Sequence, residues 1–438
     1  TDKLTHGSSD TEQDSIASQP FASVTVTSTV PTAAATTTTK NQTSSVTIQD
    51  FTIKFGTPKW EAAVGETLKE FGVAVIENVF SPDECTAHMR ELVQGHYKLS
   101  PSLRKQWIDC HTPPGPRSGL FQNTSVHFPP VWRVRTDPRV RQIFEASYGA
   151  LRQRPIKDFV TSCDGINLRP PGPPYYTEHS ADWAHLDQTT SSDPAVKTNP
   201  FLCVQGQAVL SNSTACFRCS PRSHKAFEAI SALTRPNYAR AGARSNWNLF
   251  KEHQYKNIRR LVLGVGGTWQ IPIQAPRGSI ILWLSSTVHS ARLQTAQQPK
   301  RTPKDPYNGW RGVVYVCLRP QEDVDDAHMT RIELAVYNNR CTNHWGERLF
   351  PCKASSRCRR EGKILRYIRN PVLVRKDFPE LAPEMTKELI ALIRRPEAKA
   401  SNVEDTDEDG NQTTATADQV ENVAPNATTN KSATKKKR

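Results

Sequence analysis

Short runs of β-branched and aromatic residues, separated by proline and glycine, dominate the hydrophobic pattern from Phe159 onward. Such runs are typical of β-strands. They cover Phe159–Cys163, Phe201–Leu210, Ala215–Cys219, Gly267–Ile273, Gly278–Leu284 and Arg311–Leu318, and two earlier runs, Val46–Phe51 and Phe71–Phe80, also have a strand-like pattern. Several short strands joined by long loops predict an antiparallel sandwich or barrel rather than a doubly wound sheet.

Helical spacing of apolar residues is confined to a few segments that flank these runs. The clearest helix is predicted from Ser81 to about Gly95, where a serine precedes Pro82 and two acidic residues, as is typical of a helix start. Further helices are predicted at Arg139–Tyr148 and Met385–Arg395. The fold class expected is therefore mainly β (α+β), with helices flanking the strands.

Composition divides the chain into three parts. Residues 1–45 are rich in Thr and Ser, and residues 396–438 pass from an acidic cluster to the basic run Lys435–Arg438. Neither end has enough apolar residues to offset its chain entropy, so both tails are predicted to be disordered. One ordered domain is expected over residues 46–395. The loop at Pro170–Tyr176 is too rich in proline for regular structure and is predicted to border a pocket.

The formal net charge of +14 belongs to this central domain, because acidic residues outnumber basic ones in each tail. A basic body suggests an acidic substrate or a polyanion such as nucleic acid as a partner. A solvated surface that aids solubility is the alternative. The final Lys435–Arg438 run is consistent with a nuclear address, a nonspecific phosphate contact or a solvated tail.

The chain has 10 cysteines at irregular spacing, and Cys163, Cys203 and Cys317 lie within apolar strand-like runs. This pattern favours buried free thiols in a reducing compartment over a disulfide framework. No apolar run is long enough to span a bilayer. We therefore expect an intracellular protein, cytoplasmic or nuclear, without a membrane span.

The most informative motif is His185-Leu186-Asp187, since a histidine and an aspartate two residues apart on a strand point to the same side. A third ligand, His289, follows the apolar run that begins at Ser279. Two histidines and one carboxylate on one face of an ion describe the non-haem Fe(II) facial triad, which leaves coordination positions open. His185, Asp187 and His289 are the predicted metal-binding and catalytic residues.

A 2-oxoacid that chelates the iron would need a cation for its far carboxylate, and a guanidinium offers bidentate recognition. Arg311 opens the strand-like run after His289, so it is the preferred candidate. Arg301, in a stretch of loop composition, is the second choice. Arg292 lies at odd spacing from His289 and would face away if that strand continued.

These segments together resemble the phytanoyl-CoA dioxygenase superfamily of Fe(II)/2-oxoglutarate oxygenases. The likeness includes the Phe71–Glu84 segment, His185-Leu186-Asp187, the strand from Phe201 to Gln207, the turn Cys219–Lys225 and the run from Pro276 to His289. The resemblance implies a double-stranded β-helix, or jelly roll, with flanking helices.

The chain departs from that family at two points. Arg222 stands where the family usually has glycine, so the turn either avoids a positive φ or strains a larger residue there. The interval from His289 to Arg311 is also longer than in many relatives. His224 in the same turn is expected to be structural rather than a metal ligand.

Two cysteine groups suggest other chemistry. Cys216 and Cys219 have Cys-X-X-Cys spacing, but they sit in a predicted strand with no helix following, which argues against a redox role. Cys341, His344, Cys352 and Cys358 are four zinc-type ligands close together in the chain. Their irregular spacing leaves a structural zinc site and ordinary loop or core thiols as the alternatives.

The function predicted is an Fe(II)/2-oxoglutarate-dependent dioxygenase that hydroxylates an organic substrate with release of succinate and CO2, with ascorbate as an accompanying reductant. A small-molecule substrate is expected, although a protein side chain and a nucleobase are alternatives. The competing hypothesis is a catalytically silent jelly-roll module that binds nucleic acid or another polyanion. The sequence indicates neither the primary substrate nor the oligomeric state.

Overall fold

A computed structural model describes most of the central part of the chain, namely residues 46–99, 119–121, 123–172, 183–188, 199–241, 248–337, 339–343 and 379–395. The two predicted tails and the Lys435–Arg438 run lie outside the described residues. So does the proline-rich loop beyond Gly172. Among the described residues, no helix has both the length and the apolar character that crossing a membrane requires.

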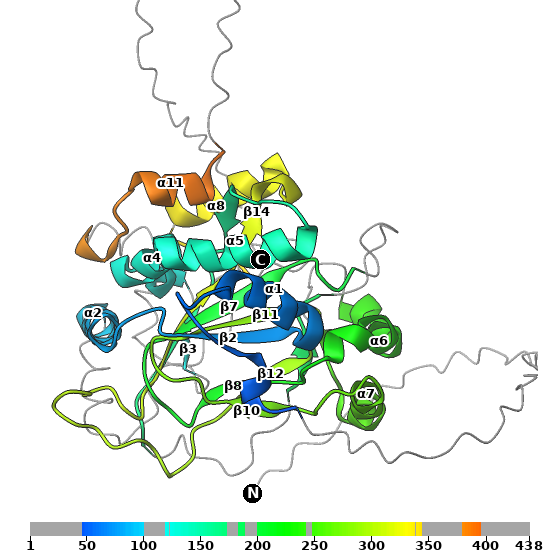
Figure 1. The fold of residues 1–438 in the computed structure, drawn as a ribbon. Coiled ribbons are helices and arrows are strands. Elements are labelled where there is room, and N and C mark those ends of the chain that lie inside the picture. Colours follow the sequence, from blue (N-terminus) through cyan, green and yellow to red (C-terminus); the bar gives the residue numbers. More distant parts are fainter. Residues whose placement is uncertain are drawn as a thin grey trace, which may run out of the picture. The chain divides into compact units, whose positions relative to one another are not determined.

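A seven-stranded sheet forms the main body of the fold (Figure 1). Its strands, in order across the sheet, are β1 (Thr52–Lys54), β2 (Val73–Glu77), β11 (Ile280–Leu284), β7 (Val204–Val209), β13 (Arg311–Val316), β5 (Ile166–Arg169) and β3 (Leu120–Phe121). The β1–β2 pair is parallel and all the other pairs are antiparallel. The antiparallel sheet expected from the sequence is therefore present.

A second, five-stranded sheet faces the first. Its strands, in order, are β10 (Ile271–Ile273), β8 (Cys216–Cys219), β12 (His289–Arg292), β6 (His185–Leu186) and β9 (Asn248–Leu249). All of its pairs are antiparallel. A two-stranded sheet joins β14 (Leu318–Pro320) to β4 (Phe159–Thr161). The fold is thus a mixed one, with helices around mainly antiparallel sheets.

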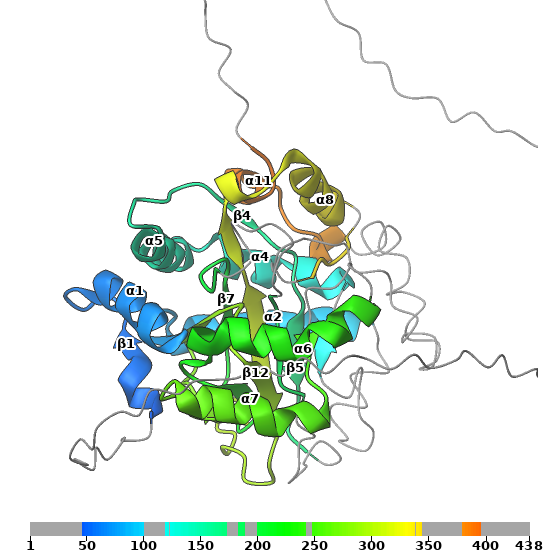
Figure 2. The ribbon, with the colours of Figure 1, turned by 90° about the vertical axis from the view of Figure 1, so that its right-hand side faces the viewer.

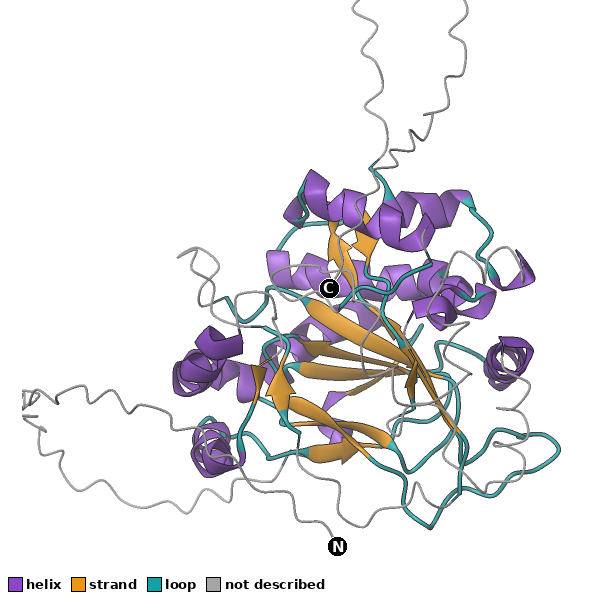
Figure 3. Cartoon of the chain, turned by 180° about the vertical axis from the view of Figure 1, so that it is seen from behind, coloured by secondary structure: helices purple, strands orange, loops and turns teal. Residues whose placement is uncertain are grey.

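Helices pack on the outer faces of both sheets, as seen from behind in Figure 3: one set covers the seven-stranded sheet, and α6 (Phe227–Ala241) and α7 (Glu252–Gly264) cover the five-stranded one. The helices are α1 (Trp60–Phe71), α2 (Pro82–Leu99), α4 (Pro129–Thr136), α5 (Pro138–Arg152), α6 (Phe227–Ala241), α7 (Glu252–Gly264), α8 (Asp326–Tyr337) and α11 (Lys387–Ile393). Short 3-10 helices are η1 (Ile48–Phe51), η2 (Asn123–His127), η3 (Ser223–Ala226), η4 (Gln321–Asp323) and η6 (Pro379–Leu381). The three predicted helices match α2, α5 and α11, and Ser81 caps α2 through a reciprocal pair of hydrogen bonds with Glu84.

Strand alternation divides the core into two layers. Along β11, Ile280, Leu282 and Leu284 pack with the helices, whereas Ile281 and Trp283 face the small sheet. All five side chains are buried, because this strand has apolar neighbours on both faces. A strand of this kind reads as a continuous apolar run in the sequence.

Three strand predictions need correction. Val46–Phe51 is not a strand: residues 48–51 form η1, because the Asp50 carboxylate accepts hydrogen bonds from the Thr47 amide and hydroxyl. The run from Ser279 to His289 is not one strand either, since β11 ends at Leu284 and His289 begins β12 in the other sheet. Likewise β13 ends at Val316, and Leu318 starts β14 in the two-stranded sheet.

Candidate metal centre

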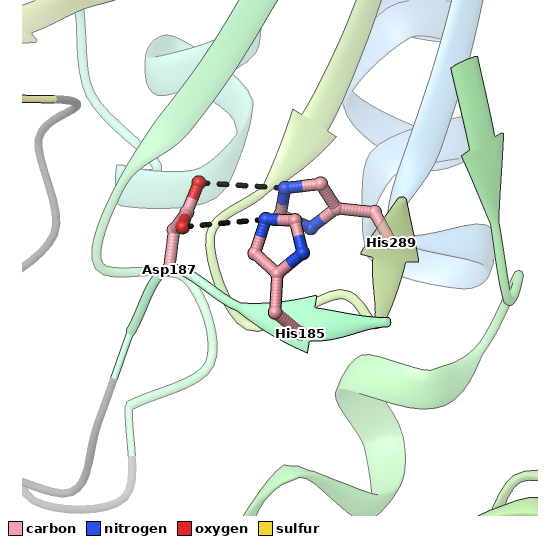
Figure 4. A group of neighbouring side chains, drawn as sticks. All are labelled: His185, Asp187 and His289. Carbon is pink, nitrogen blue, oxygen red and sulfur yellow. Dashed lines mark ion pairs between the residues drawn. The ribbon is translucent and has the colours of Figure 1, made fainter. Parts of the chain in front are cut away.

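His185, Asp187 and His289 converge on one point between the two sheets (Figure 4). β6 carries His185, Asp187 follows directly after β6, and His289 pairs with His185 across β12 and β6. The His185 Nε2 lies 3.6 Å from Asp187 Oδ1, and the His289 Nε2 lies 3.4 Å from Asp187 Oδ2. All three side chains are buried, and their ligand atoms lie within 4.8 Å of one another. The structure thus brings together the three residues that the sequence singled out.

The backbone orients both imidazole rings in the same way. His185 Nδ1 lies 3.0 Å from the carbonyl oxygen of Trp183, and His289 Nδ1 lies 2.8 Å from that of Thr287. A carbonyl oxygen only accepts hydrogen bonds, so Nδ1 carries the proton in each ring and Nε2 keeps its lone pair. Each histidine is therefore held by the residue two positions earlier, with Nε2 directed towards Asp187.

Asp187 is held by two contacts from neighbouring strands. Its amide donates to the Ser285 carbonyl oxygen at 3.1 Å, and the Gln205 Nε2 donates to its Oδ2 at 3.0 Å. Outer-shell donors of this kind orient the ligands of a metal and tune its affinity. The sequence analysis did not identify Gln205. The signal was present, because Gln205 and Gln207 are polar residues two apart within an otherwise apolar strand.

This donor set fits a divalent first-row metal. Two neutral imidazole nitrogens and one carboxylate oxygen on one side of an ion leave other coordination positions free. The buried Asp187 carboxylate lies beside the Nε2 atoms of both histidines, and a buried charge is costly unless it is compensated. A bound cation between Asp187 and the two Nε2 atoms would supply that compensation.

The side of the triad next to His289, which we call the inner side, is closed. Phe217 and Trp283 lie with their ring centroids 5.6 and 5.5 Å from that of His289, and they contact each other at 4.5 Å. Both are buried, as is Cys219, which pairs with His289 across β8. Solvent therefore has little access to the metal position from this direction.

On the side next to His185, which we call the outer side, two large apolar side chains are exposed among the described residues. The Trp183 indole stacks on the His185 ring at 4.9 Å with an interplanar angle of 16°, and Trp183 remains 40% exposed. Leu249 on β9 pairs with His185 across the strands and is 38% exposed. Residues directly opposite on antiparallel strands project from the same face, so Leu249 and His185 point the same way.

Arg311 lines a pocket that shares Phe217 with the inner side of the triad. The pocket is lined by residues of both sheets, including Gln207, Cys216, Phe217 and Arg311. Arg311 is 3% exposed, and its Nε and Nη1 have no hydrogen-bond partner within the described part of the chain. Burial raises the pKa of the Cys216 thiol to about 11, and the nearby positive charge of Arg311 opposes that shift. A buried guanidinium with unused donors is suited to an anionic ligand.

The other two candidate arginines, Arg301 and Arg292, lie in different surroundings. Arg301 is exposed, beside the turn in which Thr302 pairs with Asp305. Arg292 is half-buried at the end of β12, opposite Cys216 on β8. Neither is among the residues that line the pocket.

The side chains of the turn Cys219–Lys225 make structural contacts. Arg222 adopts a φ of 67°, so the larger residue is placed in the left-handed region that glycine favours. Its side chain pairs with Glu70 and lies over the Phe71 ring. His224 Nε2 donates to the Lys69 carbonyl oxygen at 3.0 Å, and burial lowers the pKa of His224 to about 4.

The predicted free thiols are confirmed for every cysteine within the described residues, all of which are buried. Burial raises the pKa of the Cys219 thiol as well as that of Cys216, which makes a reactive pair unfavourable. Cys341 is among these buried cysteines. His344, Cys352 and Cys358, the other members of the predicted zinc site, lie outside the described residues.

No protein-family model matches the chain, and no curated protein matches it. Solved structures with a similar arrangement include the hypothetical protein JW0805 of Escherichia coli, with 14% identity and a TM-score of 0.44, covering 66% of this chain and 77% of that one. GlcNAc Inducible Gene 2, GIG2 (DUF1479), of Candida albicans has 16% identity and a TM-score of 0.37, covering 61% and 66%. The epimerase SnoN from nogalamycin biosynthesis, in complex with Fe3+, alpha ketoglutarate and nogalamycin RO, has 11% identity and a TM-score of 0.34, covering 60% and 84%.

Proposed function

We propose that this protein is an Fe(II)/2-oxoglutarate-dependent dioxygenase that hydroxylates an organic substrate and releases succinate and CO2. The observation that carries the proposal is the buried convergence of His185, Asp187 and His289, with both Nε2 atoms turned towards the carboxylate. Two histidines and a carboxylate on one face of an ion are the ligand set of non-haem Fe(II) oxygenases. A catalytically silent polyanion-binding module would have no need of such a buried arrangement.

We assign the fold to the double-stranded β-helix class on the path of the chain between the two sheets. In chain order, β5 lies in the large sheet, β6 in the small, β7 in the large, β8, β9 and β10 in the small, β11 in the large, β12 in the small and β13 in the large. This repeated crossing between facing antiparallel sheets is the pattern of a jelly roll. The metal ligands then come from two adjacent strands of the small sheet, and Arg311 from the large one.

Arg311 would hold the distal carboxylate of 2-oxoglutarate. Its Nε and Nη1 have no hydrogen-bond partner within the described residues, so both remain available as charged donors to a carboxylate. The pocket between Arg311 and Phe217 adjoins the inner side of the triad, so a dicarboxylate could reach from the arginine towards the metal. Arg301 is exposed and lines no part of this pocket, which favours Arg311.

The residues of this chain would bind the iron, orient its ligands and exclude water from the site. Asp187 and the two histidines would present one face to the iron, while Gln205 would keep the carboxylate in place. Phe217 and Trp283 would keep water away from the inner side, where the cosubstrate lies. When bound, the iron supplies the oxygen activation that no side chain can perform.

The experiment is succinate release by the full chain supplied with Fe(II), 2-oxoglutarate, ascorbate and oxygen, with or without candidate small-molecule substrates. We expect the wild-type protein to form succinate, and Asp187→Ala to lower the rate more than about 100-fold, because removal of a ligand exceeds the effect of an outer-shell residue. Asp325→Ala, which removes an exposed carboxylate paired with His328, is the matched control and should retain the rate. Absence of both succinate and iron uptake in the wild type would rule out the proposal.

A further inference from the structure

The chain between β8 and β10 contributes strand β9, which lies next to the strand that carries His185. This segment contains η3, α6, β9 and α7, and Figure 2 shows α6 and α7 side by side. Without β9, the strand that carries His185 would be the edge of the small sheet. Instead β9 pairs with β6, so that Leu249 lies opposite His185 and Asn248 lies opposite Leu186.

The two residue pairs between β6 and β9 point to opposite faces of the sheet. Leu186 and Asn248 point towards the helices, where Leu186 packs with residues of α6 and α7 and the Asn248 amide donates to Thr234. His185 and Leu249 point to the other face, which carries the metal triad. The helices anchor β9 on one face, and that anchoring fixes Leu249 beside His185 on the other.

The side chains of Leu249 and Trp183 are exposed, whereas the neighbouring His185 is buried. Both belong to the few large apolar side chains that are exposed within the described residues. They flank His185, which is itself buried, and one face of the Trp183 indole rests on the imidazole. Exposed apolar groups next to a metal ligand indicate a surface for a ligand rather than a part of the core.

We propose that Trp183 and Leu249 form the platform on which the primary substrate binds, and that this substrate presents a planar aromatic group to the outer side of the metal. The inference rests on the proposed function, in which the inner side is taken by 2-oxoglutarate. A flat indole face with an aliphatic side chain beside it favours a planar ring, which can stack on the indole and contact the leucine. The α6–β9–α7 segment then determines which substrates reach the metal.

The test uses the full chain loaded with Mn(II), which accepts the same imidazole and carboxylate ligands as Fe(II). The probes are benzamide and its saturated counterpart cyclohexanecarboxamide, which share one polar group and differ in planarity. Paramagnetic broadening of their proton signals reports binding close to the metal. We expect broadening of benzamide and much less of cyclohexanecarboxamide.

Variants then separate the platform from the metal site. Trp183→Ala should weaken benzamide binding about tenfold, and Leu249→Ala by a smaller factor, because stacking and apolar contact are lost. Trp183→Phe should restore most of the binding. Mn(II) affinity should stay unchanged in all three, since the backbone carbonyl of residue 183 still holds His185. Leu263→Ala removes another exposed leucine, on α7, and is the control.

The outcomes separate this inference from the proposed function. If the wild type does not bind Mn(II), the metal site itself is wrong and the proposed function fails with it. If Mn(II) binds but benzamide is not broadened, or is broadened equally in Trp183→Ala, the aromatic platform is wrong and the metal site stands. Equal broadening of the two probes would exclude the preference for a planar group.

Discussion

The two histidines of the triad make equivalent hydrogen bonds in contrasting surroundings. Each Nδ1 donates to the carbonyl two residues earlier, yet His289 lies against the buried rings of Phe217 and Trp283, whereas His185 lies between the exposed Trp183 and Leu249. The sheet thus sets the ligand geometry, and the neighbouring side chains set the access. Under the proposed function, the buried side of the triad would hold the cosubstrate and the side with exposed apolar groups would receive the substrate.

Replacing one aromatic residue by alanine on each side of the triad should produce the largest difference, measured as the loss of stability. Phe217→Ala should lower the free energy of unfolding by about 3–5 kcal/mol, because it empties a space in the core. Trp183→Ala should lower it by only about 1 kcal/mol, because that side chain is 40% exposed and loses mainly one stacking contact. Urea denaturation of the two variants measures both values. Equal losses would contradict the assignment of a closed inner side and an exposed outer side.

His224 offers a pH test of the closed side. It packs next to Gly72, whose carbonyl oxygen accepts a hydrogen bond from Thr287, the residue that holds His289. Burial lowers the pKa of His224 to about 4, so the folded state resists protonation. The stability that this histidine contributes is complete above about pH 6.5, its unfolded value, and is lost as the pH falls towards 4.

The variant His224→Gln retains a donor for the Lys69 carbonyl without titrating. Between pH 6.5 and 4 the wild type should lose about 3 kcal/mol more stability than the variant. Denaturation of both proteins across this range gives the difference, in which the buried His96 cancels because both proteins contain it. Parallel stability curves would show that His224 is not held neutral by the fold.

Arg311 should decide how the inner side recognises a dicarboxylate. Arg311→Met should raise the dissociation constant of 2-oxoglutarate about 10- to 100-fold through the loss of charge-assisted hydrogen bonds. Binding of pyruvate, a 2-oxoacid without the distal carboxylate, should change little. Calorimetric titration of the metal-loaded protein measures both. If Arg301→Met weakens 2-oxoglutarate binding instead, the cosubstrate arginine is Arg301.

The smallest of these effects is expected from a substitution of Gln205, which should weaken metal binding. Gln205→Leu removes the donor to Asp187 Oδ2 and should weaken metal binding about tenfold. Gln207→Leu, two residues further along the same strand, removes a side chain that lines the pocket of Arg311 and serves as the control for metal binding. Metal titration of both variants would refute the role of Gln205 if their affinities were equal.

The sequence predicted the site more completely than it predicted the fold. Period-two alternation was enough to place His185 and Asp187 on one side, since that geometry depends only on local backbone. The predicted strand Gly278–Leu284 ended where β11 ends, but the pairing of His289 in the other sheet could not be predicted, because it depends on long-range contacts. The Leu249 contact was missed for the same reason, and the helix α1 was not among the predicted helices.

The central claim is that His185, Asp187 and His289 hold one iron ion that also binds 2-oxoglutarate. The most direct measurement is anaerobic titration of the metal-free protein with Fe(II), followed by 2-oxoglutarate, under observation by visible absorption. The account predicts one Fe(II) per chain, a metal-to-ligand charge-transfer band when 2-oxoglutarate is added, and loss of both in Asp187→Ala. Iron binding that persists in Asp187→Ala, or the absence of the band in the wild type, would contradict it.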